Sequence, residues 1–196
     1  MARILPVGMA IAAVFVLASW THGFQAFTSF SAARVAAGPL PRPAPPLLVV
    51  DARGTRYDLA APGPAFRLVQ AMYLRCPDVC PIAMANLGQV QYALRDLSPG
   101  RVEVVSLSID GDSPRDLLDR WRAHGSPEGW TMASLEATDG ANAMERLGIW
   151  VYRRRDGLIN HSTDMVLIDR AGRVVRVFRA DGDPGVIAAE IRRLAS

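Results

Sequence analysis

The amino-terminal segment of the chain is uncharged over a length that restricts how it can fold. From Ile4 to Trp20 no side chain carries a charge, and after Arg3 the next charged residue is Arg34. A run of this length is at the short end of what crosses a bilayer as a helix, and it exceeds the usual apolar region of a signal peptide. We therefore predict a transmembrane anchor, equivalent to an uncleaved signal, over residues 1–33. A cleaved signal peptide and a buried core helix are the alternatives.

A proline-rich stretch separates this segment from the rest of the chain. Five Pro residues fall within residues 38–46, a density that rules out packing as helix or sheet and favours an extended spacer. We predict a linker over residues 34–46 and one globular domain over residues 47–196. With 50% hydrophobic and 21% charged residues, a domain of this size can bury a core without disulfide staples.

The charge distribution argues against a nucleic-acid partner. The formal net charge is +3, but residues 1–50 hold three of the 22 basic residues and none of the 19 acidic ones. The globular part is therefore neutral. A protein that binds phosphate backbones concentrates positive charge on its folded part, so we expect no nucleic acid as a partner.

Hydrophobic periodicity in the globular part alternates between strand and helix. The expected strands are Leu47–Val50, Thr55–Leu59, Phe66–Tyr73, Val102–Ile109, Met165–Ile168 and Arg173–Phe178. The expected helices are Pro81–Leu97, Pro114–His124 with Ser113 as N-cap, Asp139–Leu147, and Pro184 to the C-terminus. This order predicts an α/β fold with a central sheet flanked by helices. Cysteines at the tip of the first long helix of the domain make the arrangement thioredoxin-like.

Two cysteines, Cys76 and Cys80, lie where the strand over residues 66–73 leads into the following helix. Residues four apart share a helix face, so two thiolates there can hold one metal ion, or form a disulfide after a modest backbone adjustment. Pro81 suits the first helical position, and the positive end of the helix dipole then favours the Cys80 thiolate. A purely structural disulfide is the alternative, but so short a loop stabilises little.

Of the three histidines, His161 has the position that best suits a ligand. His22 belongs to the apolar segment or its edge, and His124 ends a predicted helix, where a cation is favourable. His161 stands in a predicted loop before a buried strand, which is where functional side chains often lie. It is either a third ligand or a solvent-facing residue. Met165, nearby, is either an axial ligand or a core residue.

Three segments of the chain resemble the motifs of the Sco/SenC family. The sequence Cys-Pro-Asp-Val-Cys-Pro over Cys76–Pro81 resembles its signature, and His161–Gly172 resembles its later histidine motif. Ser106–Pro114 resembles a strand-end motif between them. The resemblance extends over residues 47–196. It departs from the family pattern at four positions and removes no proposed ligand; these are Leu74, Gly111, Asp164 and Val166.

The resemblance implies a membrane-anchored copper protein with a thioredoxin fold. The copper ligands would be Cys76, Cys80 and His161, with copper as Cu(I), Cu(II) or both. The implied partners are a copper donor protein and the subunit that carries the CuA centre of cytochrome c oxidase. The uncharged segment, with Arg3 before it, places the N-terminus in the cytoplasm by the positive-inside rule. The implied location is a bacterial-type inner membrane, with the globular domain in the periplasm.

These residues favour a metallochaperone, a binding protein rather than an enzyme. Soft thiolates select Cu(I) and imidazole accommodates Cu(II), although zinc also accepts this ligand set. The alternative is a thiol–disulfide oxidoreductase that uses Cys76 and Cys80 as a reversible catalytic disulfide and reduces the cysteines of the oxidase copper site or of a copper carrier. It is less favoured because no Pro lies between Pro127 and Pro184, whereas thioredoxin-type reductases place a cis-Pro beside their cysteines. A peroxidase is weaker still, since no Thr lies between Thr55 and Cys76.

Overall fold

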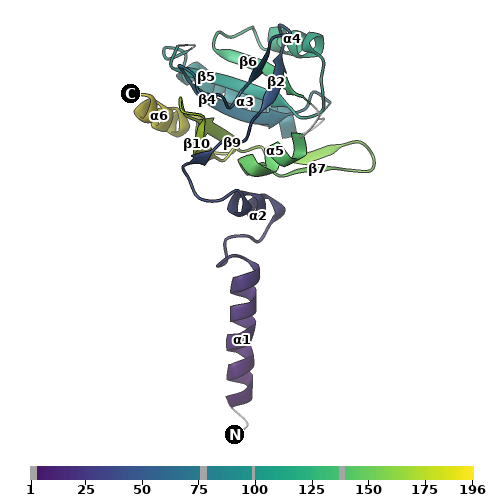
Figure 1. Ribbon diagram of the computed structural model, residues 1–196, viewed down its shortest axis with the longest axis vertical. Helices are drawn as coiled ribbons and strands as arrows, with labels where there is room; N and C mark the ends of the chain where they lie inside the picture. The colour runs from purple at the N-terminus through teal and green to yellow at the C-terminus, as the bar shows by residue number, and fades with distance from the viewer. Residues whose placement is uncertain (1–3, 76–78, 99, 137–139) are drawn as a thin grey trace.

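The body of the protein is a central sheet with helices on both faces, and a separate N-terminal helix projects from it (Figure 1). This computed structural model describes residues 4–75, 79–98, 100–136 and 140–196. The helices are α1 (Ile4–Trp20), α2 (Ser29–Ala36), α3 (Val79–Ala93), α4 (Pro114–Ala123), α5 (Gly140–Leu147) and α6 (Pro184–Ala195). The predicted α/β class, with a central sheet flanked by helices, is confirmed.

Eight strands form the central sheet in the order β1-β10-β9-β4-β5-β6-β2-β3. They are β1 (Arg42–Pro43), β2 (Leu48–Asp51), β3 (Arg56–Asp58), β4 (Phe66–Met72), β5 (Val102–Ser108), β6 (Trp130–Leu135), β9 (Met165–Ile168) and β10 (Arg173–Phe178). β4, β5 and β6 run parallel through the crossover helices α3 and α4, and the outer strands join antiparallel. This topology fits the predicted thioredoxin-like fold.

The core lies on both faces of the sheet, which explains why apolar residues of the central strands do not alternate strictly with polar ones. Consecutive residues of β4 serve opposite faces: Leu68 packs with the cluster that includes α3, α4 and α6, and Val69 with the cluster that includes α5. The helical spacing of Leu87, Val90, Leu94 and Leu97 predicts one apolar face: Leu87 and Val90 of α3 and Leu94 just after it are fully buried, and Leu97 is partly buried. The helical spacing of the sequence therefore identified the correct face.

Several boundaries differ from the predicted ones. α3 ends at Ala93, not at Leu97, because the chain turns there before β5. The predicted N-cap of α5, Asp139, lies outside the described residues. Ser113 does cap α4, and its hydroxyl accepts a hydrogen bond from the Asp116 N–H.

Two further elements are absent from the sequence prediction. β6 has polar residues, Thr131 and Ser134, inside an otherwise apolar run, and it forms between its partners β5 and β2. A separate two-stranded hairpin consists of β7 (Val151–Arg153) and β8 (Ile159–His161). His161 therefore ends a strand, and its predicted place in a loop is wrong.

The proline-rich stretch packs against the domain, so the prediction that it cannot join a sheet is wrong. Arg42 and Pro43 pair antiparallel with β10, and the guanidinium of Arg42 donates a hydrogen bond of 2.9 Å to the Leu147 carbonyl. β1 is an edge strand, where the missing N–H of a proline costs no ladder hydrogen bond if it faces outward. Two residues of the predicted spacer thus form an edge strand of the sheet.

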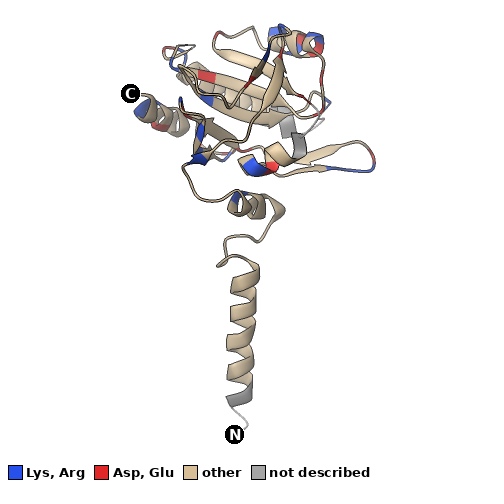
Figure 2. Ribbon diagram, viewed as in Figure 1, with Lys and Arg blue, Asp and Glu red and all other residues tan. Residues whose placement is uncertain are grey.

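The uncharged N-terminal segment forms α1, which stands away from the body and bears no charged residue in its described part (Figures 1 and 2). At 17 residues, α1 is about 26 Å long at 1.5 Å per residue. The hydrocarbon core of a typical bilayer is about 30 Å thick. Within residues 4–75, 79–98, 100–136 and 140–196, no helix is both long enough and apolar enough to cross a bilayer. The prediction of a transmembrane helix is therefore not supported.

Candidate functional site

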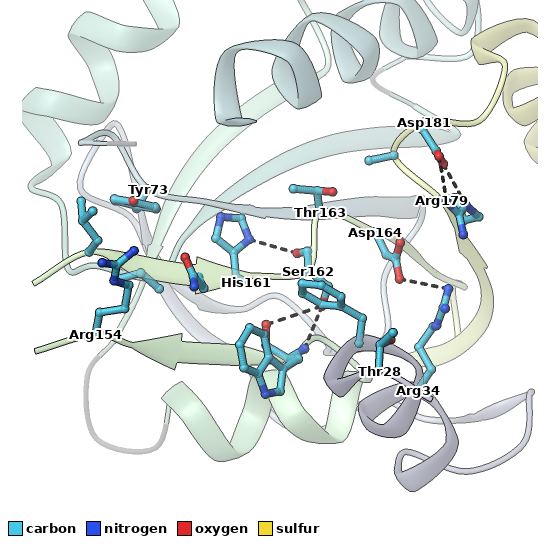
Figure 3. Close-up of a pocket in the computed structure, with 16 residues that line it drawn as sticks. Thr28, Arg34, Tyr73, Arg154, His161, Ser162, Thr163, Asp164, Arg179 and Asp181 are labelled. Carbon is cyan, nitrogen blue, oxygen red and sulfur yellow. Dashed lines mark hydrogen bonds and ion pairs between the residues drawn. The ribbon is translucent and has the colours of Figure 1, made fainter. Parts of the chain in front are cut away.

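A pocket of about 740 Å³ opens beside the end of β8 (Figure 3). Five parts of the chain line it: α2 with its N-cap, the residue after β4, the β7–β8 hairpin with the residue before it, the loop from β8 to β9, and the turn after β10. His161 lies in this lining together with Tyr73, which follows β4. The pocket therefore gathers segments that are far apart in the sequence around one of the predicted ligands.

The ring of His161 is held in a defined tautomer. Its Nδ1 lies 3.0 Å from the Ser162 carbonyl oxygen. Because a carbonyl oxygen only accepts hydrogen bonds, Nδ1 carries the proton and the lone pair of the neutral ring resides on Nε2. Burial lowers the pKa of His161, and this outweighs the opposite effect of the hydrogen bond to Ser162. The imidazole is thus neutral near pH 7, the form in which histidine binds a metal.

The backbone that follows His161 is anchored by buried polar residues. The hydroxyl of Ser162 accepts a hydrogen bond of 2.8 Å from the Trp150 N–H, and the Ser162 N–H donates to the Trp150 carbonyl at 2.9 Å. One residue further, the side chain of the buried Gln70 donates to the Thr163 carbonyl at 2.9 Å. These bonds tie the histidine segment to Trp150, between α5 and β7, and to the central strand β4, which limits the orientations of the ring.

The cysteine segment is described in part. Cys76 lies outside the described residues, and Cys80 is described as the second residue of α3, without its side chain. Tyr73, three residues before Cys76, packs edge-on against His161 with ring centroids 6.0 Å apart. The chain therefore enters the cysteine segment from a position beside His161. This juxtaposition fits a site that combines thiolates with an imidazole, although the three predicted ligands are not all described together.

A metal cluster without the cysteines is not found: the described part of the chain contains no group of three or more His, Cys, Asp or Glu residues that could hold a metal. Met165 belongs to the core, since its side chain is fully buried in β9. His124 caps α4 as predicted, beside Trp130, and is not among the residues that line the pocket.

The sequence prediction missed the contribution of α2 to this pocket. Arg34 of α2 forms an ion pair of 3.3 Å with Asp164 (Figure 3). Phe30 packs edge-on against Trp150, with ring centroids 5.2 Å apart. Burial raises the pKa of Asp164, and the nearby arginines oppose that rise only in part. A local signal for α2 exists in the capping box that Thr28 forms with the third residue of the helix.

Comparison with known proteins identifies related folds. The family model described as SCO1/SenC matches residues 44–196. A SCO1/SenC family lipoprotein from Bacillus anthracis is 21% identical, with a TM-score of 0.72 over 81% of this chain and 98% of its own. The copper-bound ScoI of Bradyrhizobium japonicum is 21% identical, with a TM-score of 0.65 over 78% of this chain and 99% of its own.

A third structure adds a relative with a stated role. BsSco, described as a member of the Sco family of cytochrome c oxidase assembly proteins, is 15% identical, with a TM-score of 0.64. The similarity covers 81% of this chain and 96% of BsSco. At these identities the structures establish a shared fold. No curated protein matches the chain.

Proposed function

The chain belongs to the SCO1/SenC family, and on that premise we propose that it is a copper chaperone that delivers copper to the CuA centre during cytochrome c oxidase assembly. The copper-bound Bradyrhizobium relative supports copper as the cargo, and BsSco supports the role in oxidase assembly. The partners are then the oxidase subunit that carries the CuA centre and a protein that donates the copper. Copper is the cargo of this protein: the protein binds the ion and transfers it to the recipient.

We assign the copper ligands as the thiolates of Cys76 and Cys80 and the imidazole of His161. The observation that carries this assignment is the neutral ring of His161, with Nδ1 bonded to a backbone carbonyl and the lone pair on Nε2. Two thiolates favour Cu(I), and the added imidazole makes Cu(II) acceptable. Three protein ligands also leave a coordination position for a ligand of the donor or recipient.

The thiols must be reduced before copper binds. Joining Cys76 to Cys80 in a disulfide releases two electrons and two protons to an oxidant and removes both thiolate donors. Metal loading and thiol redox state are therefore coupled. The same reversible disulfide is the basis of the alternative function, a membrane-bound thiol reductase, which the following experiment distinguishes.

The test is a titration of the full-length protein in detergent, reduced and free of metal, with Cu(I) and with Cu(II). We expect one tightly bound copper ion per chain and, for Cu(II), an absorption band from thiolate-to-metal charge transfer. Replacing either cysteine with Ala, Cys76→Ala or Cys80→Ala, should remove that band. An absence of tight copper binding, combined with ready reduction of a model disulfide, would instead establish the thiol reductase.

We also propose that α1 attaches the domain to a membrane. No charged residue occurs from Ile4 to Ala33, and apolar side chains of the helix such as Ile11 and Val14 are well exposed. Exposed aromatic residues follow at Trp20 and in the turn after it, as at membrane–water interfaces. The Bacillus relative is described as a lipoprotein. The charge pattern favours an inner membrane of bacterial type, with the copper domain in the periplasm.

Placing a charge within α1 should weaken this attachment. Val14 is 57% exposed, and Arg near the middle of an inserted helix costs about 2.5–3.5 kcal/mol. We therefore expect Val14→Arg to move a large share of the protein from the membrane fraction to the soluble fraction of lysed cells. Val186→Arg, at a valine 67% exposed on α6, is the matched control and should leave fractionation unchanged. Equal membrane retention of both variants would refute the attachment by α1.

A further inference from the structure

A buried carboxylate next to the candidate site is shared between two arginines. Asp110 follows the end of β5, and its side chain is 4% exposed. The guanidinium of Arg75 donates to Oδ2 through Nη2 and, at 3.0 Å, through Nε. Arg153 donates to the other oxygen, Oδ1, through Nη1 at 2.8 Å. Each carboxylate oxygen is thus held by a different cation.

The two arginines belong to the two segments that carry the proposed ligands. Arg75 directly precedes Cys76 in the sequence. Arg153 ends β7 and pairs in register with Ile159, two residues before His161 on β8. Asp110 therefore joins the entrance of the cysteine segment to the hairpin that bears the histidine.

Further hydrogen bonds fasten the cysteine side of this junction. Oδ2 of Asp112 accepts hydrogen bonds from the Leu74 N–H at 3.2 Å and from the Ser108 hydroxyl at 2.7 Å. At the same residue, Arg120 of α4 donates a hydrogen bond to the Leu74 carbonyl at 3.4 Å. The loop after β5 thus holds residues 74 and 75 through both backbone and side chain.

Among the arginine–carboxylate pairs of the described residues, Asp110 has the least exposed carboxylate, at 4% against 10% for Asp169 and 14% for Asp164. In the pairs Arg192–Asp96 and Arg179–Asp181 the carboxylate side chains are 59% and 69% exposed. A buried carboxylate is tolerated only when it is well paired, and truncating one partner leaves an uncompensated charge. Burial raises the pKa of Asp110, but the hydrogen bonds from Arg153 and Arg75 outweigh it, and the group remains ionised at neutral pH.

We propose that Asp110 is a positioning residue that fixes the cysteine segment and the β7–β8 hairpin in one relative geometry, and so sets the separation between the two thiolates and His161. This inference deepens the proposed function and rests on it for the identity of the metal, copper. The linkage itself is a property of the metal-free chain, because Asp110 bridges the segments through the two arginines.

The first test is Asp110→Asn, which keeps the size of the side chain and removes its charge. Asp96→Asn is the matched control, since it breaks a two-contact arginine pair between the end of α3 and α6. In the metal-free protein we expect faster hydrogen exchange of backbone amides in residues 151–161 for Asp110→Asn and unchanged exchange there for Asp96→Asn. Exchange in the hairpin equal to that of the control would overturn the linkage.

The second readout is copper itself. We expect Asp110→Asn to lower Cu(II) affinity by about 10- to 100-fold, the range found when partners that orient metal ligands are removed. The charge-transfer band and the electron paramagnetic resonance parameters should shift with it. A variant that unfolds at a lower temperature but binds copper with wild-type affinity and spectrum would assign Asp110 a structural role alone.

A milder variant covers the case in which Asp110→Asn fails to fold. Arg153→Gln removes one cation at a half-exposed position and should reproduce the faster hairpin exchange, whereas Arg122→Gln, in an exposed pair on α4, should not. Hairpin exchange equal in these two variants would refute the linkage. If the wild-type chain binds no copper, the proposed function fails, and the exchange experiment still decides whether Asp110 links the two segments.

Discussion

Replacing His161 with Ala is expected to lower the Cu(II) affinity of the protein by at least about 100-fold, the upper end of what loss of a ligand-orienting partner costs. The imidazole is the one nitrogen donor in the proposed set, and without it the site reduces to two thiolates, which favour Cu(I). The thiolate-to-Cu(II) absorption band should disappear. Cu(I) affinity should fall by less, because both thiolates remain. Competition titrations with chelators of known affinity measure both changes.

The control for this prediction is His124→Ala. This histidine caps α4 beside Trp130, so its loss tests for non-specific copper binding by imidazole. A His161→Ala protein that retains Cu(II) like the control would refute the proposed ligand set. The same variant separates the two functions, because removing His161 spares the cysteines. A chaperone should lose its Cu(II) site, whereas a thiol reductase should keep its disulfide chemistry.

The parts of the fold that the sequence predicts correctly are those with local signals. Helix α4 begins where a serine cap precedes a proline, and α6 begins where Asp183 precedes Pro184. The strands β4 and β5 have seven residues each, of which most in β4 and four in β5 are apolar, because helices cover both faces of the sheet. In each case the pattern of a short window determines the element.

The elements that the sequence does not predict depend on distant partners. β6 pairs between β5 and β2, so its neighbours decide its conformation. The strands β7 and β8 have three residues each, too few for a periodic pattern. β1 exists because two residues of the proline-rich stretch meet the open edge at β10.

The candidate site shows the same division. The cysteine spacing and His161 are evident in the sequence, and the structure places His161 in the pocket. The partners of Asp110 are not evident, because Arg75 lies 35 residues before it and Arg153 lies 43 residues after it. Single charges at such separations carry no pattern. The contribution of Arg34 is hidden likewise, since it depends on α2 packing near Asp164.

Substitution of Met165 is expected to have a large effect on stability, and it tests whether this methionine binds the metal or packs in the core. Met165 is fully buried, and its neighbours across the sheet are Phe178 of β10 and Gln70 of β4. We expect Met165→Ala to lower the free energy of unfolding by about 2–5 kcal/mol, through lost burial and the cavity that remains. Urea unfolding of the metal-free protein measures this loss.

Met165→Leu distinguishes the two roles. Leucine fills nearly the same volume, so a core residue should tolerate this change at a cost below about 1.5 kcal/mol, with copper affinity and spectrum unchanged. An axial ligand would behave in the opposite way, because leucine has no sulfur to offer: the folded protein would remain stable while its Cu(II) spectrum shifted. Met9→Ala, at an α1 methionine 68% exposed, controls for the loss of a thioether as such and should leave the unfolding of the domain unchanged. Met165 begins β9, four residues after His161. A stable Leu variant with normal copper binding would therefore also show that the copper site does not use the sulfur of Met165.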